Sequence, residues 1–398
     1  GGKIELLNWN NNILWNYAIA NDSLQHHHDI EPLPNGNILV IVWQRKTLEE
    51  AQNMGRETIE SSLGQIWSEA ILEIEPIGLD SAAIVWEWHL WDHLIQNIDS
   101  SIENYGIISN HPELFNINLG EIGFGDGALG SNNADWVHFN SVHYNQELDQ
   151  IILSSRTMNE FYVIDHSTTT EEAASHSGGV SGKGGDFLYR WGNPQNYGRG
   201  NDSDHWLGDQ HSINWIDEEY PGEGNLICYV NQYNNNYSAA LELDPPLLED
   251  GSYYIEDGEP YGPDSYTWLK EASSNFNFST QMQGGAFRLP NGNTLITDCD
   301  SASIYEVDES GTLLDTYSEG GNNLMIARAQ RYNPEYFNFI TGTPGDVNQD
   351  EVINVLDVVL TVNMILGVQD YNSLADLNDD NIINVLDVVL LINLILNP

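Results

Sequence analysis

The sequence predicts an all-β chain that ends in a small α-helical domain. The first observation is a series of short apolar runs, broken by Asn, Gly, Asp and Pro, that continues to about residue 339. The second is a hairpin phrase, Leu-Pro-Asn-Gly-Asn, which occurs at Leu33–Asn37 and again at Leu289–Asn293. The third is a change of composition after residue 345, where an Asp- and Asn-rich motif occurs twice and each copy precedes an apolar helical pattern.

The apolar runs have the length and the residue types of β-strands. Ile151–Leu153 and Phe161–Asp165 lie on either side of Arg156 and indicate two short antiparallel strands. Long helical periodicity is nearly absent from this part of the chain, so we expect strands throughout it. Longer runs of the same character are Asn37–Trp43, Ala83–Trp88, Asn225–Val230 and Asn293–Thr297.

The repeated hairpin phrase indicates how the strands are arranged. Asn-Gly between two apolar runs favours a type I′ turn, in which both residues have positive φ. A hairpin phrase that recurs at distant points of an all-β chain is typical of radially repeated sheets. We therefore predict a β-propeller, and a large β-sandwich is the alternative.

Three stretches are predicted to be insertions between the strands. Residues 47–64 suit an amphipathic helix or a lid. Residues 166–185 are rich in Ser, Thr and Gly, which predicts a mobile loop. Residues 249–274 are acidic, aromatic and rich in turn formers, and we expect them to cover an entrance.

The charge of the chain excludes two classes of partner. Among its 398 residues, 60 are acidic and 12 are Lys or Arg, which gives a formal net charge of −48. Such a surface repels nucleic acid and anionic membranes, and it suits a saline or calcium-rich extracellular setting. No run of apolar residues is long enough to span a membrane. The two cysteines, Cys228 and Cys299, are either bridged or simply buried.

The composition change divides the chain into a propeller at residues 1–340, a linker at 341–345 and a helical domain at 346–398. The motif at Asp346–Asp357 recurs at Asp376–Asp387, 30 residues later (376 − 346). Oxygen ligands at loop positions 1, 3, 5 and 12, with a backbone carbonyl at position 7, are how an EF-type loop binds calcium. We therefore predict two calcium ions. The apolar stripes of the following helices should pack on each other; they comprise Val355, Val358, Val359, Val362, Val385, Val388, Val389 and Ile392.

This paired loop-helix segment resembles a type I dockerin domain. The helix-start positions that dockerins use to recognise cohesin are apolar here, Val355-Leu356 and Val385-Leu386. This departure indicates docking to another surface protein, or to the protein's own propeller. The resemblance implies calcium ligands at Asp346, Asn348, Asp350, Val352 (carbonyl) and Asp357, and at Asp376, Asn378, Asp380, Ile382 (carbonyl) and Asp387.

Histidine, glutamine and arginine gather in phrases that precede or begin strands. A neutral imidazole and a permanent cation, such as His138 and Arg156, together suit a compact oxyanion. In a propeller the innermost strands line a central channel, so such phrases from several sheets can converge there. The remaining phrases are Gln25–Asp29, Gly208–Trp215 and Gln281–Arg288.

Most other histidines have a simpler interpretation. A single His beside aromatic residues is usually a hydrogen-bonded structural residue. The run His26–His28 has a transition-metal site as an alternative, although it lacks the second ligand cluster typical of zinc. We expect a structural role for His89, His93, His111, His143 and His205.

Four phrases together resemble the bacterial arylsulfate sulfotransferases over about residues 7–339. They are His-His-Asp before Leu-Pro-Asn-Gly-Asn, Asp-Trp-Val-His-Phe-Asn-Ser-Val followed by Ser-Ser-Arg, Leu-Tyr-Arg-Trp-Gly-Asn-Pro, and Gln-His-Ser. The resemblance implies a six-bladed propeller that moves a sulfuryl group from an aryl sulfate to a phenolic acceptor without a nucleotide. It implies that His211 is transiently sulfated, and that His28 (with His27 as second choice), His138 and Arg156 bind sulfate.

Two further functions stay open at this point. A secreted acidic propeller with a calcium-binding tail also suits a non-catalytic structural or adhesive subunit of an extracellular assembly or filament, joined to others through that tail. A polysaccharide-degrading enzyme is a third interpretation, which would use His and Tyr around the channel. The presence of His28, His138, Arg156 and His211 together favours the sulfotransferase.

Overall fold

The computed structural model describes residues 2–59, 61, 63–123, 133–234, 237–318, 324–332, 343–348, 350, 352–368, 372–378 and 382–396. The chain divides into two compact units, Gly1–Gln330 and Arg331–Pro398. Among the described residues, no helix is long and apolar enough to cross a membrane.

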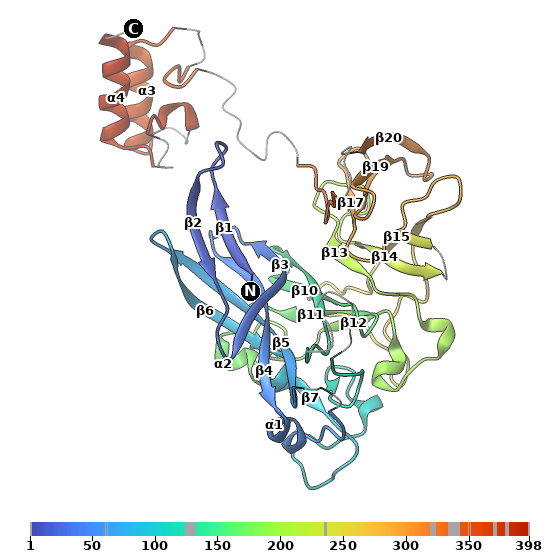
Figure 1. Cartoon of the computed structure of the whole chain (residues 1–398). Coiled ribbons are helices and arrows are strands. Elements are labelled where there is room, and N and C mark those ends of the chain that lie inside the picture. Colours follow the sequence, from blue (N-terminus) through green and yellow to red (C-terminus); the bar gives the residue numbers. More distant parts are fainter. Residues whose placement is uncertain are drawn as a thin grey trace. The chain divides into compact units, whose positions relative to one another are not determined.

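The first unit is built mainly from antiparallel four-stranded sheets, which we number 1 to 4 in chain order (Figure 1). Sheet 1 comprises β3 (Leu24–Pro32), β4 (Ile38–Thr47), β5 (Gln65–Ile77) and β6 (Ser81–His89). Sheet 2 comprises β9 (Phe139–Asn145), β10 (Gln150–Ser155), β11 (Glu160–Asp165) and β12 (Tyr189–Trp191). Sheet 3 comprises β13 (His211–Trp215), β14 (Leu226–Asn234), β15 (Tyr237–Leu243) and β16 (Trp268–Glu271). Sheet 4 comprises β17 (Gly285–Arg288), β18 (Thr294–Asp298), β19 (Ser303–Val307) and β20 (Leu313–Ser318).

Two smaller sheets and several short helices complete this unit. β1 (Lys3–Leu7) pairs with β2 (Ile13–Ala18), and β7 (Leu94–Ile95) pairs in parallel with β8 (Phe115–Asn116). The helices are α1 (Leu48–Asn53) and α2 (Thr170–Ala173), with 3-10 turns η1 (Leu90–His93), η2 (Ile108–Asn110), η3 (Pro194–Tyr197) and η4 (Asp202–Asp204). The mostly-β prediction is confirmed. The described residues give four four-stranded and two two-stranded sheets, so six blades stays a prediction.

The predicted insertions have different outcomes. A helix was expected within residues 47–64, and α1 begins there behind Thr47, whose hydroxyl accepts the Glu50 N–H. Residues 166–185 contain α2 and are hydrogen-bonded to the preceding strand end, where Asp165 accepts the Ser181 N–H at 2.8 Å. The stretch 249–274 contains strand β16 as well as turns.

The hairpin phrase forms a different turn from the one predicted. Gly36 and Gly292 have φ of 87° and 84°, but Asn35 and Asn291 do not have positive φ, so neither turn is type I′. The Gly36 N–H donates to the Leu33 carbonyl at 2.9 Å, which closes a four-residue turn with Pro34 in its second position. Proline favours this geometry because its φ is fixed, and the glycine then supplies the left-handed residue that returns the chain to the next strand.

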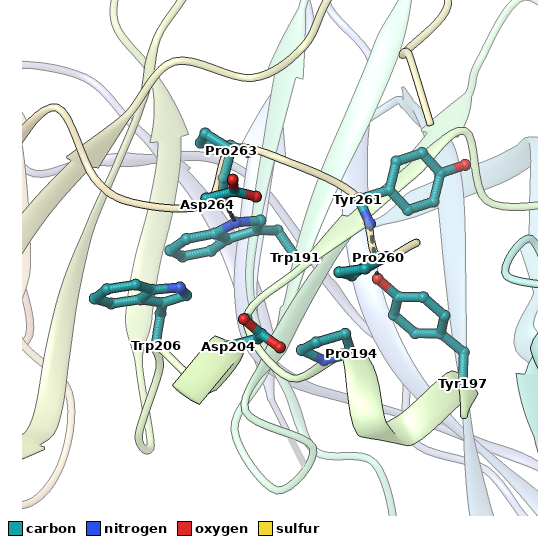
Figure 2. Close-up of a pocket in the computed structure, with 10 residues that line it drawn as sticks. Trp191, Pro194, Tyr197, Asp204, Trp206, Pro260, Tyr261, Pro263 and Asp264 are labelled. Atoms are coloured by element: carbon teal, nitrogen blue, oxygen red, sulfur yellow. Dashed lines mark hydrogen bonds between the residues drawn. The ribbon is translucent and has the colours of Figure 1, made fainter. Parts of the chain in front are cut away.

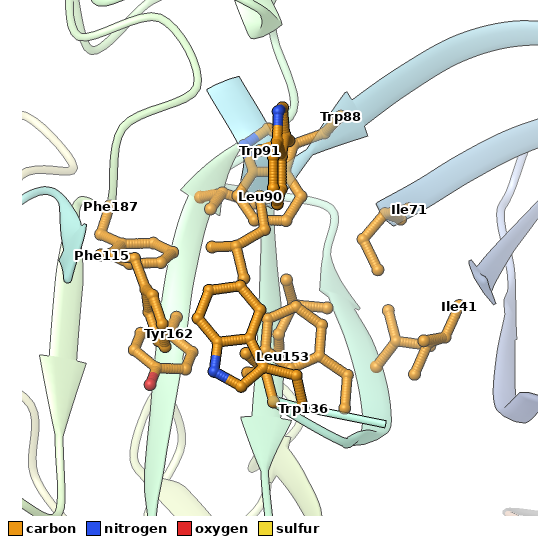
Figure 3. Close-up of a cluster of buried hydrophobic side chains, with 14 of the residues drawn as sticks. Ile41, Ile71, Trp88, Leu90, Trp91, Phe115, Trp136, Leu153, Tyr162 and Phe187 are labelled. Atoms are coloured by element: carbon orange, nitrogen blue, oxygen red, sulfur yellow. The ribbon is translucent and has the colours of Figure 1, made fainter. Parts of the chain in front are cut away.

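Large aromatic side chains fill the core between sheets 1 and 2 (Figure 3). Trp88 and Trp136 are fully buried, and each indole N–H has a carbonyl acceptor, Gly185 O at 2.7 Å and Leu119 O at 2.7 Å. Each ring therefore contributes the free energy of burying its apolar surface, and its indole N–H does not remain as an unpaired buried donor. Cys228 and Cys299 are both buried free thiols.

Side chains connect the first strand of each sheet to the first strand of the next. Asp29 of β3 accepts the Val142 N–H of β9 at 3.2 Å, and Ser141 of β9 accepts the Ile213 N–H of β13 at 3.1 Å. Ser212 of β13 then donates to the Gly284 carbonyl, which precedes β17, at 2.8 Å. The four strands β3, β9, β13 and β17 therefore follow one another in space in chain order.

The segment 324–332 returns the chain from sheet 4 to sheet 1. The Gly284 N–H donates to the Ala327 carbonyl at 3.0 Å, which attaches the segment beside β17. Arg328 then makes two hydrogen bonds to Asp29 of β3, at 2.6 and 2.7 Å. A bidentate guanidinium–carboxylate pair is both strong and directional, so it fixes the register of this return.

The second unit contains α3 (Val355–Ile365), η6 (Ser373–Ala375) and α4 (Val385–Leu396). The helices contact each other, but the prediction that their apolar stripes pack together is wrong. Val355 and Val385 are both 66% exposed, whereas the buried positions are Asp357 and Thr361 in α3 and Asp387 and Leu391 in α4. The last loop acids must face inward to complete their loops, and this rotates the valine stripes outward.

Candidate functional site

Three of the four predicted catalytic residues, His28, His138 and His211, lie at bulges where the first strands of their sheets begin, and Arg156 follows the end of β10. His28, His138, Ser212 and Gln283 have φ between 53° and 57°, in the left-handed region that most side chains avoid. Strand pairing shifts register at the corresponding places, between His26 and Ile30 in β3 and between His211 and Asn214 in β13. A bulge redirects the side chain at its centre, so each sheet presents one polar side chain out of its ladder.

These bulges bring the four predicted catalytic residues together. The rings of His28 and His138 contact each other, with centroids 4.4 Å apart. The Arg156 N–H donates to the His138 carbonyl at 3.1 Å, and the Arg156 guanidinium lies 3.4 Å from the Asp209 carboxylate. The Asp209 carbonyl in turn accepts from His211 Nδ1 at 2.9 Å, so one continuous set of contacts joins all four.

His211 is held as a neutral imidazole with its Nε2 lone pair available. Its Nδ1 faces two oxygen acceptors, Asn231 Oδ1 at 2.7 Å and the Asp209 carbonyl, so Nδ1 carries the proton. Nε2 receives only the Gln283 N–H, at a long 3.3 Å. Burial, followed by the positive charges of Arg156 and His138, lowers the pKa of His211 to about 4. A neutral imidazole with this tautomer is a nucleophile at Nε2.

His138 differs from His211 because its Nδ1 faces a carboxylate rather than neutral oxygen acceptors. Its Nδ1 is hydrogen-bonded to the Asp135 carboxylate, which is 2% exposed and also accepts the Trp43 indole N–H at 3.1 Å. Burial alone lowers the pKa of His138, but the hydrogen bond and the charge of Asp135 outweigh it and the net pKa is raised. His138 is therefore the imidazole of this site that most readily becomes cationic.

A third group of side chains forms a chain of hydrogen bonds that ends at His28. Glu69 of β5 contacts His27 Nε2 at 3.0 Å, and His27 Nδ1 contacts His28 Nδ1 at 2.7 Å. Burial, then the charge of Asp135, raises the pKa of Glu69 well above its usual range, and burial lowers the pKa of both His27 and His28. The chain is therefore a protonated acid followed by two neutral imidazoles.

The hydrogen-bond partners fix the tautomers along this chain. The Phe139 N–H donates to Glu69 Oε1 at 3.0 Å, which leaves Oε2 to carry the acid proton towards His27 Nε2. His27 then carries its proton on Nδ1 and donates it to His28 Nδ1, so His28 carries its own proton on Nε2. The Trp43 ring stacks on His27 at 4.0 Å and holds this imidazole in place.

Sequence reasoning missed several of these residues. Glu69, 0% exposed in an otherwise apolar stretch of β5, gives only one local signal, a carboxylate among buried residues. Asp135 stands inside the phrase that contains His138, three residues before it, and could have been found by this spacing. Asn231 lies 20 residues beyond His211, on the next strand, and has no local signal.

A separate pocket lies away from this cluster, beside η3 and the stretch before β16 (Figure 2). The rings of Trp191 and Trp206 stack across it at 6.4 Å, and the Tyr197 hydroxyl accepts the Tyr261 N–H at 3.1 Å. None of the four predicted catalytic residues lines it. The concentration of imidazoles and of Arg156 makes the His/Arg cluster the better candidate for chemistry.

The C-terminal loops bring together most of the predicted calcium ligands. Asp357 and Asp387 are 0% exposed, and Asp346 and Asp376 are 4% and 8% exposed. Asp357 accepts the Asn348 N–H at 3.1 Å and the Asn354 N–H at 2.8 Å. The acid at the last position of the loop therefore accepts backbone hydrogen bonds from an early and a late part of the loop.

The second loop repeats this arrangement, because Asp387 accepts the Asn384 N–H at 2.8 Å and the Asn378 N–H at 3.4 Å. Asp380 lies outside the described residues. Buried like charges around a loop fit a hard dication such as calcium, which takes oxygen ligands.

Comparisons with known proteins agree with these two units. Residues 11–253 match the arylsulfotransferase (ASST) family, and residues 344–396 match the dockerin type I domain. No curated protein matches the chain.

Solved structures give weak likenesses only. One is a protein of unknown function from Bacteroides caccae, with 12% identity, a TM-score of 0.40, and coverage of 81% of this chain and 77% of that chain. Another is the β-propeller domain of Cps50 (Swd1) from Myceliophteria thermophila, with 8% identity, a TM-score of 0.35, and coverage of 79% and 80%. A third is virginiamycin B lyase from Staphylococcus aureus, with 9% identity, a TM-score of 0.30, and coverage of 77% of each chain. TM-scores this low carry no argument about function.

The environment of His211 predicts that this residue stays neutral across the physiological range. Because its pKa is lowered to about 4, it should take up a second proton only as the pH falls below about 5. Nitrogen-15 NMR of histidine-labelled protein should show His211 protonated on Nδ1 and unprotonated on Nε2 from pH 5 to 8. The exposed His205 is the internal control, and a His211 titration midpoint near 6.5 would contradict the assignment.

Proposed function

Because the chain belongs to the arylsulfotransferase family, we propose that it transfers a sulfuryl group from an aryl sulfate to a phenolic acceptor, through a sulfohistidine at His211 and without a nucleotide. The observation that carries the proposal is the state of His211. Its Nδ1 is fixed as a donor to Asn231, its Nε2 is unprotonated, and its contacts lead directly to Arg156 and His138. A nucleophile beside two cationic groups suits transfer of an anionic group.

In the first half-reaction His211 Nε2 attacks the sulfur of the aryl sulfate. The S–N bond forms while the bond from sulfur to the phenolic oxygen breaks, and the electron pair of that bond leaves with the phenolate. Arg156 and His138 hold the sulfuryl oxygens, whose charge is spread over three atoms as in phosphoryl transfer. Asn231 accepts the hydrogen bond from Nδ1 throughout, which stabilises the positive charge that develops on the ring.

The leaving phenolate takes its proton from His28. His28 gives up the proton on Nε2 and receives one on Nδ1 from His27, which in turn receives one on Nε2 from Glu69. Each imidazole stays neutral and only exchanges its tautomer, while Glu69 becomes the carboxylate. The hydrogen bonds along this chain are 2.7 and 3.0 Å, within the range for direct proton transfer.

The second half-reaction reverses these steps with the acceptor phenol. The acceptor gives its proton to His28 Nε2, the chain returns a proton to Glu69, and the phenolic oxygen attacks the sulfur as the S–N bond breaks. The enzyme returns to its starting state, so no net proton is consumed. This order of events gives ping-pong kinetics.

The C-terminal unit is a dockerin type I domain, a class that binds calcium. We infer that each of its two loops holds one ion, with the ligands predicted above. Calcium neutralises the buried carboxylates, of which Asp357 and Asp387 are fully buried. Val355, Leu356, Val385 and Leu386 are 55–66% exposed, and we infer that this apolar surface docks to a protein partner of an extracellular assembly.

Replacement of His211 by alanine should abolish transfer because the nucleophile is lost. The fold should stay intact, because the ring is neutral, lies in an edge strand, and leaves no unpaired buried charge when it is removed. Wild-type protein mixed with nitrophenyl sulfate should release nitrophenol and gain one sulfuryl group on the peptide that contains His211, detected by mass spectrometry. The matched control is His143→Ala, a histidine of β9 outside the cluster, which should keep both signals.

Retained transfer in H211A would rule out the sulfohistidine. Absence of adduct and release in the folded, calcium-loaded wild type would favour the structural-subunit alternative.

Replacement of Glu69 by glutamine should slow transfer from poor leaving groups. The glutamine side chain keeps the size of Glu69 and its contact with Phe139 but cannot release a proton, and loss of a general acid costs about 10²-fold or more. The effect should be large for phenyl sulfate, whose phenol has a pKa near that of tyrosine, about 10. Both substrates are compared by the phenol released in a single turnover without acceptor, because the second half-reaction also uses Glu69 whichever donor is used. Under these conditions the effect should be small for nitrophenyl sulfate, whose leaving group needs no proton.

The control for this experiment lies in the same strand. Glu73 contacts His166 at 2.9 Å, outside the cluster, and E73Q should leave the dependence on the leaving group unchanged. An equal loss for both substrates in E69Q would show that Glu69 acts only through structure.

Removal of calcium should loosen the C-terminal unit alone. Without the ions the buried carboxylates repel one another, so limited proteolysis with a chelator should cut after Pro344 while unit Gly1–Gln330 stays intact. Calorimetry should count two calcium ions in the wild type and one in D357A or D387A. D250A, which removes an exposed acid of the first unit, is the control. Identical proteolysis with and without chelator would exclude calcium from this unit.

A further inference from the structure

A second cluster of imidazole and carboxylate groups lies outside the His/Arg site. His93 ends η1 after sheet 1, His176 follows α2, and Asp186 precedes β12 of sheet 2. The two histidine Nδ1 atoms each lie 2.8 Å from Asp186 Oδ1, and the three donor atoms all lie within 4.8 Å of one another. None of these residues takes part in the sulfuryl transfer proposed above.

The hydrogen bonds of His93 leave its Nδ1 without a proton of its own. Its Nε2 lies 2.8 Å from the Ala173 carbonyl, which can only accept, so a neutral His93 carries its proton on Nε2. The lone pair of His93 Nδ1 then faces the Asp186 Oδ1 atom at 2.8 Å, and His93 itself is 0% exposed. Two lone pairs at this distance need a cation between them, either a proton or a metal ion.

We propose that His93, His176 and Asp186 bind a divalent transition-metal ion of the zinc type, with water in the fourth position. A proton can join His93 to Asp186, and His176 can donate its own Nδ1 proton to the same carboxylate oxygen, whereas a metal ion would bind all three donor atoms at once. Two imidazoles and one carboxylate are a typical ligand set for zinc, while calcium prefers oxygen ligands and is expected in the C-terminal loops.

The surroundings of His93 support a built site. A metal-binding histidine usually donates its other N–H to a carbonyl or carboxylate, as His93 does to Ala173. The Trp88 ring stacks parallel to His93 with centroids 5.5 Å apart, and the Trp88 indole donates to the Gly185 carbonyl. A Cβ at Gly185 would lie 2.0 Å from the Ala173 carbonyl oxygen and 2.6 Å from His93 Nε2, so glycine allows the close approach of this loop.

The two contacts of the histidines with Asp186 need only a small adjustment. Bonds of about 2.0–2.2 Å in a tetrahedron place ligand atoms roughly 3.3 Å apart, so the two contacts of 2.8 Å would open by about half an ångström. The His176 side chain is 61% exposed and can move without repacking the core. The ion would join the loop at residues 166–185 to the ends of sheets 1 and 2.

The test measures zinc binding to the full chain in excess calcium, which keeps the C-terminal loops occupied. Titration against a chromophoric zinc chelator should show one ion in the wild type that is lost, or weakened roughly tenfold or more, in H176A. Because His176 is exposed, this variant should fold normally. Zinc should also raise the melting temperature of the wild type and not that of H176A.

The matched control is H111A. His111 is also exposed, with its Nδ1 2.9 Å from a carboxylate, Glu113, but without a second imidazole nearby, so its loss should not change zinc binding. D186N keeps the shape of the carboxylate, removes its charge and should weaken binding as H176A does. Any zinc held by the imidazoles of the His/Arg site is common to all these variants. Equal zinc binding in wild type and H176A, or none in the wild type, would show that a proton alone joins His93 to Asp186.

Discussion

The pair between Asp29 and Arg328 is the interaction on which the rest of the first unit depends. Asp29 is 8% exposed and receives four hydrogen bonds, two from Arg328, one from the Val142 N–H and one from the Ile30 N–H. It therefore joins sheet 1, sheet 2 and the returning segment 324–332 at one carboxylate. Asp29 is buried while the Arg328 side chain is 35% exposed, so loss of Arg328 would leave a poorly solvated carboxylate, whereas loss of Asp29 would leave a cation that water still reaches.

This closure also sets the position of the His/Arg cluster. His28 is the residue before Asp29, and its φ of 53° is held by the contacts on both sides of it. An isolated histidine would leave this strained conformation, because most side chains avoid positive φ. Closure of the sheets therefore stabilises the bulge, and the bulge directs the His28 ring towards His138. Hydrogen bonds between neighbouring sheets also lie beside the bulged residues His138 and Ser212. Ser141, close to His138 in the chain, and Ser212 itself form these bonds.

The sequence was sufficient for parts of the molecule whose signals are local. Strand runs such as Asn37–Trp43 and the motif at Asp346–Asp357 carry their pattern within a dozen residues, and strand β4 and helix α3 appear where these patterns predict them. The turn type at Gly36 was wrong because Pro34 fixes a different backbone geometry from the one that Asn-Gly alone favours. The outward valines of α3 were mispredicted because the periodicity of apolar residues does not show that the loop acid Asp357 must face inward.

In the candidate site, too, the sequence predicted only the residues that have a local signal. His28, His138, Arg156 and His211 stand in recognisable phrases, so they could be named without a structure. The partners Glu69, which contacts His27, and Asn231, which contacts His211, could not, because they come from other strands, 42 and 20 residues away from the imidazoles they contact. Those partners decide what each histidine does, since they fix its proton and its charge. Burial and partners, rather than residue type, keep His211 neutral and make His138 the imidazole of this site that is most readily protonated.

The acids beside the two cations have a consequence for catalysis. Arg156 lies 3.4 Å from Asp209 and His138 is bonded to Asp135, so each cation is already partly neutralised before substrate arrives. Under the proposed function the site would attract an anionic sulfate ester only moderately, in a chain whose net charge of −48 opposes anions at long range. An enzyme gains nothing from tight ground-state binding, because only interactions that strengthen in the transition state raise the rate. Fixed acids that orient Arg156 and His138 preserve their directional hydrogen bonds to the transferring group, while they limit how strongly sulfate itself is held.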